Sequence, residues 1–381
     1  MKKLVLVLIT IIFLACKQER KEQQPALIAI ENAQINYAKG FTIEKLNSGI
    51  TVIKITSPWP NAESAFTYAL IPKKKMASIT LNKEEYDAIV TIPVERIVVT
   101  STTHIPALEA LNVENKLVGF PDTKYISSEK TRKRIDEGFI KELGNNESLN
   151  TEMVLEMNPD VVVGFSINSQ NKTYETIQRS NIPVAYNGDW TEETPLGKAE
   201  WIKFFAPFFE KEILADSIFK KIETNYIKAK DLAKTAKNHP SVISGAMYKD
   251  VWYLPGGKSW AAQFVKDANA NYLWKETMET GSLSLSWENV LEKGKKADFW
   301  IGPSQFTSYL NMSDASPHYQ QFEAFQNKKV FTFSSTKGAT GGLLYYELAP
   351  QRPDLVLKDL IYILHPELLP KYQSTFFKPL D

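Results

Sequence analysis

Apolar and polar residues alternate with two different periods along the chain, and the period changes about a quarter of the way in. In the first part, "FTIEKL" at 41–46 and "TVIKI" at 51–55 alternate residue by residue, are joined by a polar turn, and are followed by "SAFTYALI" at 64–71. Strict alternation with short polar turns is typical of antiparallel strands. The pattern therefore predicts a small β meander within an N-terminal extension at 31–90.

From residue 92 onward, short apolar runs alternate with helical patterns. The runs "RIVVT" at 96–100, "KLVGF" at 116–120 and "DVVVGF" at 160–165 are apolar at successive positions. Such runs are typical of parallel strands that are buried on both faces. The same alternation returns after residue 239. The chain is thus expected to be an α/β protein with two Rossmann-like lobes, each built on a central parallel sheet.

A long helical pattern lies between the two expected lobes. Apolar residues recur at helical spacing from Leu214 to Ala233, with Lys and Glu on the other face. We expect one helix to join the lobes, with Pro207 in its first part. The expected division is an N-terminal lobe at 91–198, an inter-lobe helix at 199–238 and a C-terminal lobe at 239–381.

One helix–strand element occurs twice. The stretch "SLNTEMVLEMNPDVVVG" aligns with "LSWENVLEKGKKADFWIG" when Glu152 is placed opposite Glu288. Asn150 and Ser286 are expected to be the N-caps of the two helices, which puts each glutamate in a first turn. A glutamate in that position complements the helix dipole and needs no partner, so either one alone would carry no functional meaning.

The first residues of the chain indicate secretion and lipidation. Two lysines precede an apolar run of 11 residues, and Cys16, the single cysteine, follows directly after Ala15. The run is too short to cross a bilayer but fits a signal peptide. We expect a lipoprotein signal at 1–15, lipidation of Cys16 and a polar tether at 16–30, which would place the protein in the periplasm or cell envelope, anchored to a membrane by lipid. A plain secretory signal with an incidental cysteine is the alternative.

Composition and motifs narrow the function classes. The 381 residues include 45 basic and 44 acidic side chains, a balance that argues against a nucleic-acid partner. No G-x-S-x-G motif is present, and "PGGKS" lacks the first glycine of a phosphate-binding loop because that position is Trp252. The four histidines are scattered rather than set at metal-ligand spacing. We expect no metal site, no cofactor and no enzyme activity.

Three stretches resemble the substrate-binding proteins of ABC importers for iron–siderophores, haem and cobalamin. They are "VERIVVTSTTHIPALEALNVENKLVGF", "SLNTEMVLEMNPDVVVG" and "RPDLVLKDLIYILHPELLP", and the resemblance covers about residues 92–370. It implies a monomer that captures a small molecule with chelated iron or cobalt and delivers it to a dimeric permease in the inner membrane. It also implies that a surface glutamate in each lobe pairs with permease arginines, and by motif these are Glu152 and Glu288. The element would then be doubled because the permease has two equivalent halves.

The ligand is expected between the lobes, where loops converge at the carboxyl ends of the strands. Trp252 and Tyr253 are the strongest local candidates, because large aromatic faces suit a catecholate, corrin or porphyrin. Arg352 could meet an anionic chelate, and His104 could be an axial ligand or, more simply, a hydrogen-bond donor. The full set of candidate ligand-binding residues is Thr102, Thr103, His104, Asp122, Tyr125, Phe165, Ser166, Tyr186, Trp190, Trp252, Tyr253, Trp260, Thr280, Ser304, Phe306 and Arg352.

Two other functions fit the same pattern. A surface-exposed lipoprotein could scavenge a ligand without any permease. An enzyme could use the same bilobal scaffold, but it would need cluster-binding cysteines or a His/Glu chelatase pair, and the one cysteine stands at the expected anchor.

Overall fold

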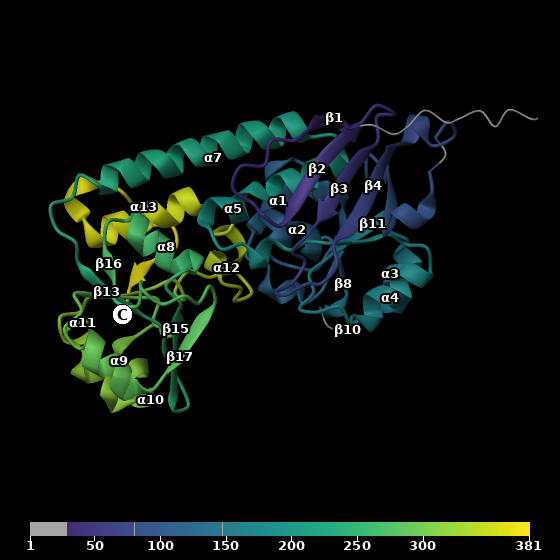
Figure 1. Ribbon diagram of the computed structural model, residues 1–381. Helices are drawn as coiled ribbons and strands as arrows, with labels where there is room; N and C mark the ends of the chain where they lie inside the picture. The colour runs from purple at the N-terminus through teal and green to yellow at the C-terminus, as the bar shows by residue number, and fades with distance from the viewer. Residues whose placement is uncertain (1–28, 80, 147) are drawn as a thin grey trace, which may run out of the picture.

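The computed structural model describes residues 29–79, 81–146 and 148–381 (Figure 1). Two α/β lobes lie side by side, and the helix α7 (Glu212–Ala233) runs along both of them. The expected signal peptide at 1–15, the lipidation site Cys16 and most of the tether at 16–30 lie outside the described residues. The α/β fold with parallel sheets and a long helix, predicted from the sequence, is confirmed.

The N-terminal extension forms a five-stranded sheet of its own. Its strands, in spatial and chain order, are β1 (Ala29–Asn32), β2 (Phe41–Leu46), β3 (Thr51–Ile55), β4 (Phe66–Pro72) and β5 (Ala88–Ile92). The strands β2, β3 and β4 pair antiparallel, as a meander should, but β5 is parallel to β4 because the intervening segment returns the chain to the same end of the sheet. Phe41, Ile53 and Tyr68 share one hydrophobic core with Val99 and Phe204, so the sheet packs on the N-terminal lobe.

The N-terminal lobe has a fully parallel sheet. Its strands, in spatial order, are β12 (Val184–Tyr186), β11 (Val161–Gly164), β6 (Ile97–Val99), β7 (Leu117–Phe120) and β8 (Lys141–Glu142). A short hairpin, β9 (Gly144–Asn145) and β10 (Ser148–Leu149), follows β8. The helices are α1 (His104–Ala110), α2 (Glu129–Asp136), α3 (Thr151–Met157) and α4 (Lys172–Arg179).

The C-terminal lobe repeats this plan with an added hairpin. Its main sheet is ordered β16 (Asn271–Tyr272), β13 (Ser241–Ser244), β18 (Phe299–Ile301), β19 (Val330–Thr332) and β20 (Lys378–Pro379), with β20 antiparallel. A separate antiparallel sheet contains β14 (Ala246–Tyr248), β15 (Val251–Pro255) and β17 (Ser282–Leu285). The helices are α8 (Trp260–Asp267), α9 (Trp287–Gly294), α10 (Tyr309–Ala315), α11 (Glu323–Gln326), α12 (Leu344–Leu348) and α13 (Pro353–Leu364).

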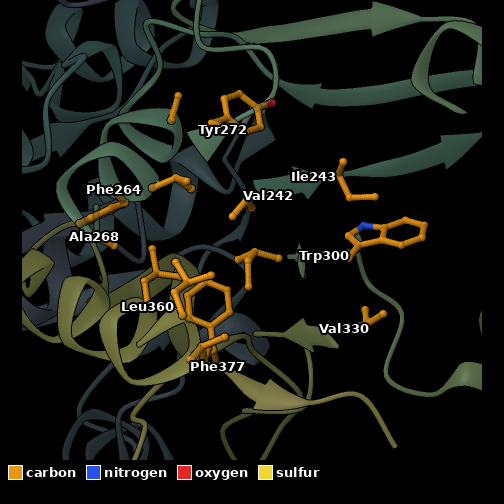
Figure 2. Packing of buried hydrophobic residues seen from close by; sticks show 14 of the residues in the cluster. Val242, Ile243, Phe264, Ala268, Tyr272, Trp300, Val330, Leu360 and Phe377 are labelled. Atoms are coloured by element: carbon orange, nitrogen blue, oxygen red, sulfur yellow. The ribbon is translucent and has the colours of Figure 1, made fainter. Parts of the chain in front are cut away.

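The core of this lobe lies on both faces of its main sheet. Val242 points towards Phe264 of α8 and Leu360 of α13, whereas Trp300, from the neighbouring strand, lies on the opposite face of the sheet (Figure 2). All four side chains are at most 2% exposed. Burial on this scale holds the strand ends in place, and those ends carry the loops that face the other lobe.

The sequence repeat corresponds to equivalent places in the two lobes. In each lobe one helix leads into the strand that pairs with the lobe's first strand. In the N-terminal lobe α3 leads into β11, which pairs with β6, and in the C-terminal lobe α9 leads into β18, which pairs with β13. The aligned residues Asp160 and Asp298 even make equivalent bonds. Asp160 accepts the backbone N–H of Arg96 at 2.9 Å, and Asp298 accepts that of Ser241 at 2.7 Å, so each carboxylate ties its helix–strand element to the start of the first strand.

The connection between the lobes is not one helix over 199–238. It consists of α5 (Pro195–Glu200), α6 (Ile202–Phe205), a 3-10 turn (Ala206–Phe209) and α7, whose 22 residues span about 33 Å. The break has a local cause, because Pro207 lacks a backbone donor and Glu210 has a positive φ of 55°. The other domain boundaries given above stay predictions.

The helix α7 belongs to both lobes. Phe219 and Ile222, in its first half, lie in the core of the N-terminal lobe. Tyr226 and Ala229, in its second half, lie in the core of the C-terminal lobe. One continuous hydrogen-bonded helix thus fixes the distance between the two sheets.

Candidate ligand-binding cleft

A cavity of about 450 Å³ opens between the two lobes. On the N-terminal side it is lined by residues that directly follow strands, namely Thr100 after β6, Pro121 after β7 and Phe165 after β11. The carboxyl ends of parallel strands meet at one edge of a sheet, which explains why these residues converge. The C-terminal lobe lines the cavity with Gln305, Ser334, Lys337, Gly341, Leu343 and Tyr346.

Asp122 and Tyr125 reach this cavity from a turn that Glu142 holds in place. Asp122 has a φ of 49°, and Glu142 of β8 accepts the backbone N–H groups of Asp122 and Thr123 at 2.9 Å each. The Asp122 carboxylate lies 3.4 Å from the ammonium of Lys124. The turn therefore presents one paired carboxylate and the ring of Tyr125, which is 54% exposed.

A second cavity, of about 560 Å³, lies in the C-terminal lobe at the carboxyl edge of its main sheet. Its walls are aromatic and aliphatic, and the aromatic side chains are those of Tyr248, Tyr253, Trp260, Phe264, Tyr272, Phe333, Tyr345, Tyr346 and Phe377. Tyr346 lines both cavities, and the adjacent residues Ser304 and Gln305 line one each. The two cavities thus adjoin at the boundary between the lobes.

Glu347 makes a direct hydrogen-bonded link between the lobes. Its side chain belongs to α12 of the C-terminal lobe, is 2% exposed, and accepts the backbone N–H groups of Ser127 at 2.5 Å and Ser128 at 2.9 Å in the N-terminal lobe. Burial raises the pKa of Glu347 to about 7, with the nearby Glu109 carboxylate adding to the rise and the two N–H bonds opposing it. We call this contact the Glu347 link.

The loop before α12 lies directly against the N-terminal lobe. The hydroxyl of Thr340 donates to the carbonyl oxygen of Lys124 at 2.7 Å. A Cβ atom at Gly342 would lie 2.1 Å from the carbonyl oxygen of Tyr125, so only glycine fits there without moving the backbone. The loop therefore closes one side of the inter-lobe cavity.

Glu152 and Glu288 are exposed on the first turns of α3 and α9, as predicted. Asn150 and Ser286 cap these helices by accepting the N–H three residues further on, at 3.0 and 3.4 Å. Neither carboxylate has an ion-pair or hydrogen-bond partner within the described part of the chain. In Figure 1 the two helices lie in different lobes, both away from α7. Each lobe therefore has one exposed, unpaired carboxylate at this aligned position.

Comparison with known proteins matches residues 97–336 to the periplasmic binding protein family. The match begins at the first residue of β6 and covers the N-terminal lobe, α7 and the C-terminal lobe as far as residue 336, before α12. The chain belongs to this family. The extension of strands β1 to β5 lies before the matched span and is an addition to it.

Individual relatives agree with the family match. An uncharacterized lipoprotein of Methanocaldococcus jannaschii is 30% identical over 300 residues, which cover 76% of this chain and 69% of the relative. A periplasmic haem-binding protein from Pseudomonas aeruginosa has the same fold with a TM-score of 0.56 and 16% identity, over 76% of this chain and 98% of that one. A possible iron-binding (periplasmic solute-binding) protein from Staphylococcus epidermidis has a TM-score of 0.55 and 17% identity, over 72% and 99% of the two chains.

Half of the sixteen predicted ligand-binding residues of this periplasmic binding protein line the inter-lobe cavity or a cavity next to it. Thr102, Asp122, Tyr125 and Phe165 line the inter-lobe cavity, Tyr253, Trp260 and Ser304 line the C-terminal cavity, and Ser166 lines a smaller neighbour of about 380 Å³. Their position is suitable for ligand contact, and their contact with a ligand stays a prediction.

Trp252, a leading candidate from the sequence, is in the core. Along β15 the exposure alternates, so that Trp252 is fully buried while Tyr253 is 43% exposed. The indole N–H of Trp252 donates to the carbonyl oxygen of Ser244 at 3.1 Å, and its ring stacks on Trp300 with centroids 5.2 Å apart. The prediction that Trp252 faces the ligand is therefore wrong, because a strand can turn only one of two successive side chains to the cleft.

His104 is also buried, behind the residues that line the cavity. It is fully unexposed and packs against Phe205, with ring centroids 5.3 Å apart. Burial lowers the pKa of His104 to about 4, although the nearby Asp189 carboxylate favours the charged form. The ring presents no nitrogen to either cavity, so its predicted roles as an axial ligand or a hydrogen-bond donor to the ligand are wrong.

Arg352 is engaged elsewhere in the protein. Its guanidinium donates to both carboxylate oxygens of Asp354, at 2.8 and 2.9 Å, and it lines a separate cavity beside α7. The prediction that Arg352 meets an anionic chelate is wrong for this reason.

Tyr186 lies in the core, and Trp190 packs behind Phe165 with ring centroids 5.6 Å apart. The remaining candidates Thr103, Thr280 and Phe306 line neither of the two main cavities.

The segment that contributes most to the inter-lobe cavity from the C-terminal lobe is not among the residues predicted from the sequence. Lys337, Leu343 and Tyr346 line the inter-lobe cavity, and Tyr345 lines the C-terminal one. The available signal was the glycine-rich stretch "KGATGG" at 337–342, directly before an aromatic pair. Glycines in such a loop can mark a close approach to another backbone.

The described residues show neither a metal centre nor a membrane span. Across 29–79, 81–146 and 148–381, no group of three or more His, Cys, Asp or Glu side chains is placed to hold a metal ion. None of the described helices combines the length and the apolar character needed to cross a bilayer.

Proposed function

We propose that this periplasmic binding protein is the substrate-binding component of an ABC importer. It captures an iron–siderophore, haem or cobalamin-type ligand between its lobes and delivers it to a dimeric membrane permease. The protein itself works as a monomer without a cofactor and catalyses no reaction. Iron or cobalt enters as part of the ligand, in keeping with cavities lined by aromatic and hydroxyl groups.

The observation that carries this proposal is the pair of unpaired glutamates. Glu152 and Glu288 occupy aligned positions in the two lobes, on helices that lead into equivalent strands. A monomer that presents the same charged group twice matches a partner with two equivalent basic sites, since complementary charges set both the encounter rate and the orientation.

Lipid anchoring through Cys16 completes the proposal. The terminal signal supports it, and so does the match to an uncharacterized lipoprotein. An anchored receptor stays close to the membrane that holds its permease, which raises its effective concentration there.

The test is uptake of the ligand by cells that carry a Glu152→Arg, Glu288→Arg double variant. Both sites are exposed, so we expect the free energy of unfolding to change by less than about 1 kcal/mol. Ligand binding to the purified protein should stay unchanged, while uptake should fall at least about tenfold through like-charge repulsion. Glu44→Arg together with Glu367→Arg, at exposed positions outside both docking helices, is the matched control. Full uptake by the double variant would contradict the docking role and would favour a scavenger that needs no permease.

A further inference from the structure

The C-terminal cavity differs in chemistry from the inter-lobe cavity it adjoins. Its described lining residues are aromatic, aliphatic, serine or glycine, and none of them carries a charge. The hydroxyl of Tyr272 donates to the carbonyl oxygen of Pro255, so even this polar group is engaged by the protein. The inter-lobe cavity, in contrast, has hydroxyl and amide groups with one acid, Asp122, and one base, Lys337.

The walls of this cavity are aromatic faces held in fixed positions. Phe333 stacks on Tyr345 with centroids 4.4 Å apart, and Tyr345 packs against Trp260 at 5.8 Å. Lys198 lies 5.3 Å from the centre of the Trp260 ring, but its ammonium donates to the backbone carbonyl oxygens of Asp189 and Trp190. The ammonium of Lys198 is therefore engaged by the backbone and not directed into the cavity.

The mouth of the cavity is open. Tyr253 is 43% exposed and Tyr346 is 50% exposed, and both side chains line it. An open apolar cavity holds water that finds few hydrogen-bond partners, so an apolar group that replaces this water is favoured. Because Tyr346 also lines the inter-lobe cavity, one ligand can occupy both at once.

We propose that the C-terminal cavity is a subsite for an uncharged, apolar arm of the ligand, while the chelating part of the same ligand lies between the lobes. The proposal rests on the proposed function and specifies its substrate class. A charged group of the ligand that is removed from water needs a partner of opposite charge. The lining of the two cavities together offers two charged side chains, Lys337 and Asp122, and Asp122 is already paired with Lys124. The ligand is thus a chelate of low net charge with a large apolar substituent, and a multiply anionic chelate is disfavoured.

The test uses two dyes with the same ring system. N-phenyl-1-naphthylamine is uncharged, and 1-anilinonaphthalene-8-sulfonate adds one sulfonate. We expect one molecule of the neutral dye to bind per chain, at least tenfold more tightly than the sulfonate. Energy transfer from the tryptophans of this lobe should report the binding, and Trp260→Phe should keep the binding and lower the transfer.

A larger side chain that fills the cavity should weaken binding of the neutral dye. Ala261 lines the cavity from α8, and Ala261→Phe should weaken binding of the neutral dye at least tenfold. Lys266→Phe, on an exposed turn of the same helix outside the lining, is the matched control and should bind as the wild type does. If Ala261→Phe does not fold, Ser282→Phe introduces the same side chain from the exposed strand on the opposite wall. Equal binding of the two dyes, or unchanged binding by a folded filled variant, would overturn the proposal.

Competition separates this proposal from the function on which it rests. A chelate with an apolar arm should displace the neutral dye from the wild-type protein. If chelates bind but leave the dye in place, the subsite is wrong and the binding function stands. If the dye binds as described but no chelate binds, the cavity is apolar as proposed and the importer function is wrong.

Discussion

Burial shifts the pKa values of His104 and Glu347 in opposite directions, because it penalises the charged form of each. The pKa of His104 falls to about 4, so the imidazole is neutral across the physiological range. The pKa of Glu347 rises to about 7, so its protonation changes within that range. At the residue scale these two groups make the stability of the protein depend on pH in opposite directions, over ranges that overlap between about 4.5 and 6.5.

For His104 we expect stability to be lost on the acid side. In the unfolded chain His104 has its ordinary pKa near 6.5, whereas in the folded protein its pKa is about 4. The stability that the neutral, buried ring contributes is therefore fully present above pH 6.5 and is lost as the pH falls through 4. The loss should reach about 3 kcal/mol. In urea unfolding between pH 7 and 4, His104→Phe should lose stability less steeply than the wild type. His239→Phe, at an exposed site, is the control and should follow the wild type. Parallel curves for the wild type and His104→Phe would show that His104 is not buried as a neutral ring.

Residue types alone did not reveal which aromatic residues face the cleft. Trp252 and Tyr253 are neighbours in the sequence, and both are large and aromatic. Only the alternation along β15, with Leu254 and Trp252 inward, decides that Tyr253 is the exposed one. That alternation is visible in the sequence, but which side of the strand faces the core depends on the sheet with which it packs.

At the scale of elements, the sequence predicted well whatever depends on local pattern. The buried strands β6 and β11 appear as apolar runs, and the caps Asn150 and Ser286 lie where predicted because capping depends on nearby residues. The contacts of the 336–347 segment with the other lobe depend instead on distant parts of the chain. The glycines of the stretch 337–342 indicate a close approach to another backbone, but they do not indicate which part of the chain is approached.

The Glu347 link gives a prediction at this scale. In the folded protein the pKa of Glu347 is about 7, above the usual 4.5. Protonation of Glu347 therefore favours the folded, linked state, and the stability that it contributes is lost as the pH rises from about 4.5 through 7. Glu347→Gln keeps an acceptor and removes the titration, so over this window the stability of the wild type should fall by up to about 3 kcal/mol relative to that of Glu347→Gln. Thermal unfolding at closely spaced pH values measures the difference. Glu367→Gln, at an exposed position, should behave as the wild type does, and an equal pH dependence of Glu347→Gln and wild type would contradict the buried link.

At the scale of the whole molecule, α7 and the Glu347 link together define the space between the lobes. The helix spans both cores on one side, and the link joins the lobes through α12 on another. Opening the cleft widely would require bending a continuous helix and breaking buried hydrogen bonds. The cavities seen here are therefore close to the form that a ligand meets.

The repeat explains how one chain presents two carboxylates at equivalent positions, one on each lobe. The elements α3–β11 and α9–β18 occupy equivalent places, and Asp160 and Asp298 attach each to its own first strand. Each glutamate is thus fixed by the core of its lobe, and α7 fixes the spacing between the lobes. A rigid spacing suits a partner whose two halves are themselves at a fixed distance.

Ligand titration followed by tryptophan fluorescence tests the central claim most directly. We predict that one of three groups, ferric siderophores, haem or cobalamin, quenches the fluorescence to saturation at one molecule per chain. Tyr346→Ala, which removes a ring shared by both cavities, should weaken that ligand at least tenfold, whereas Leu310→Ala, an exposed apolar side chain outside both cavities, should not. No saturable binding of any of the three groups, or equal affinity of Tyr346→Ala and wild type, would contradict capture of the ligand between the lobes.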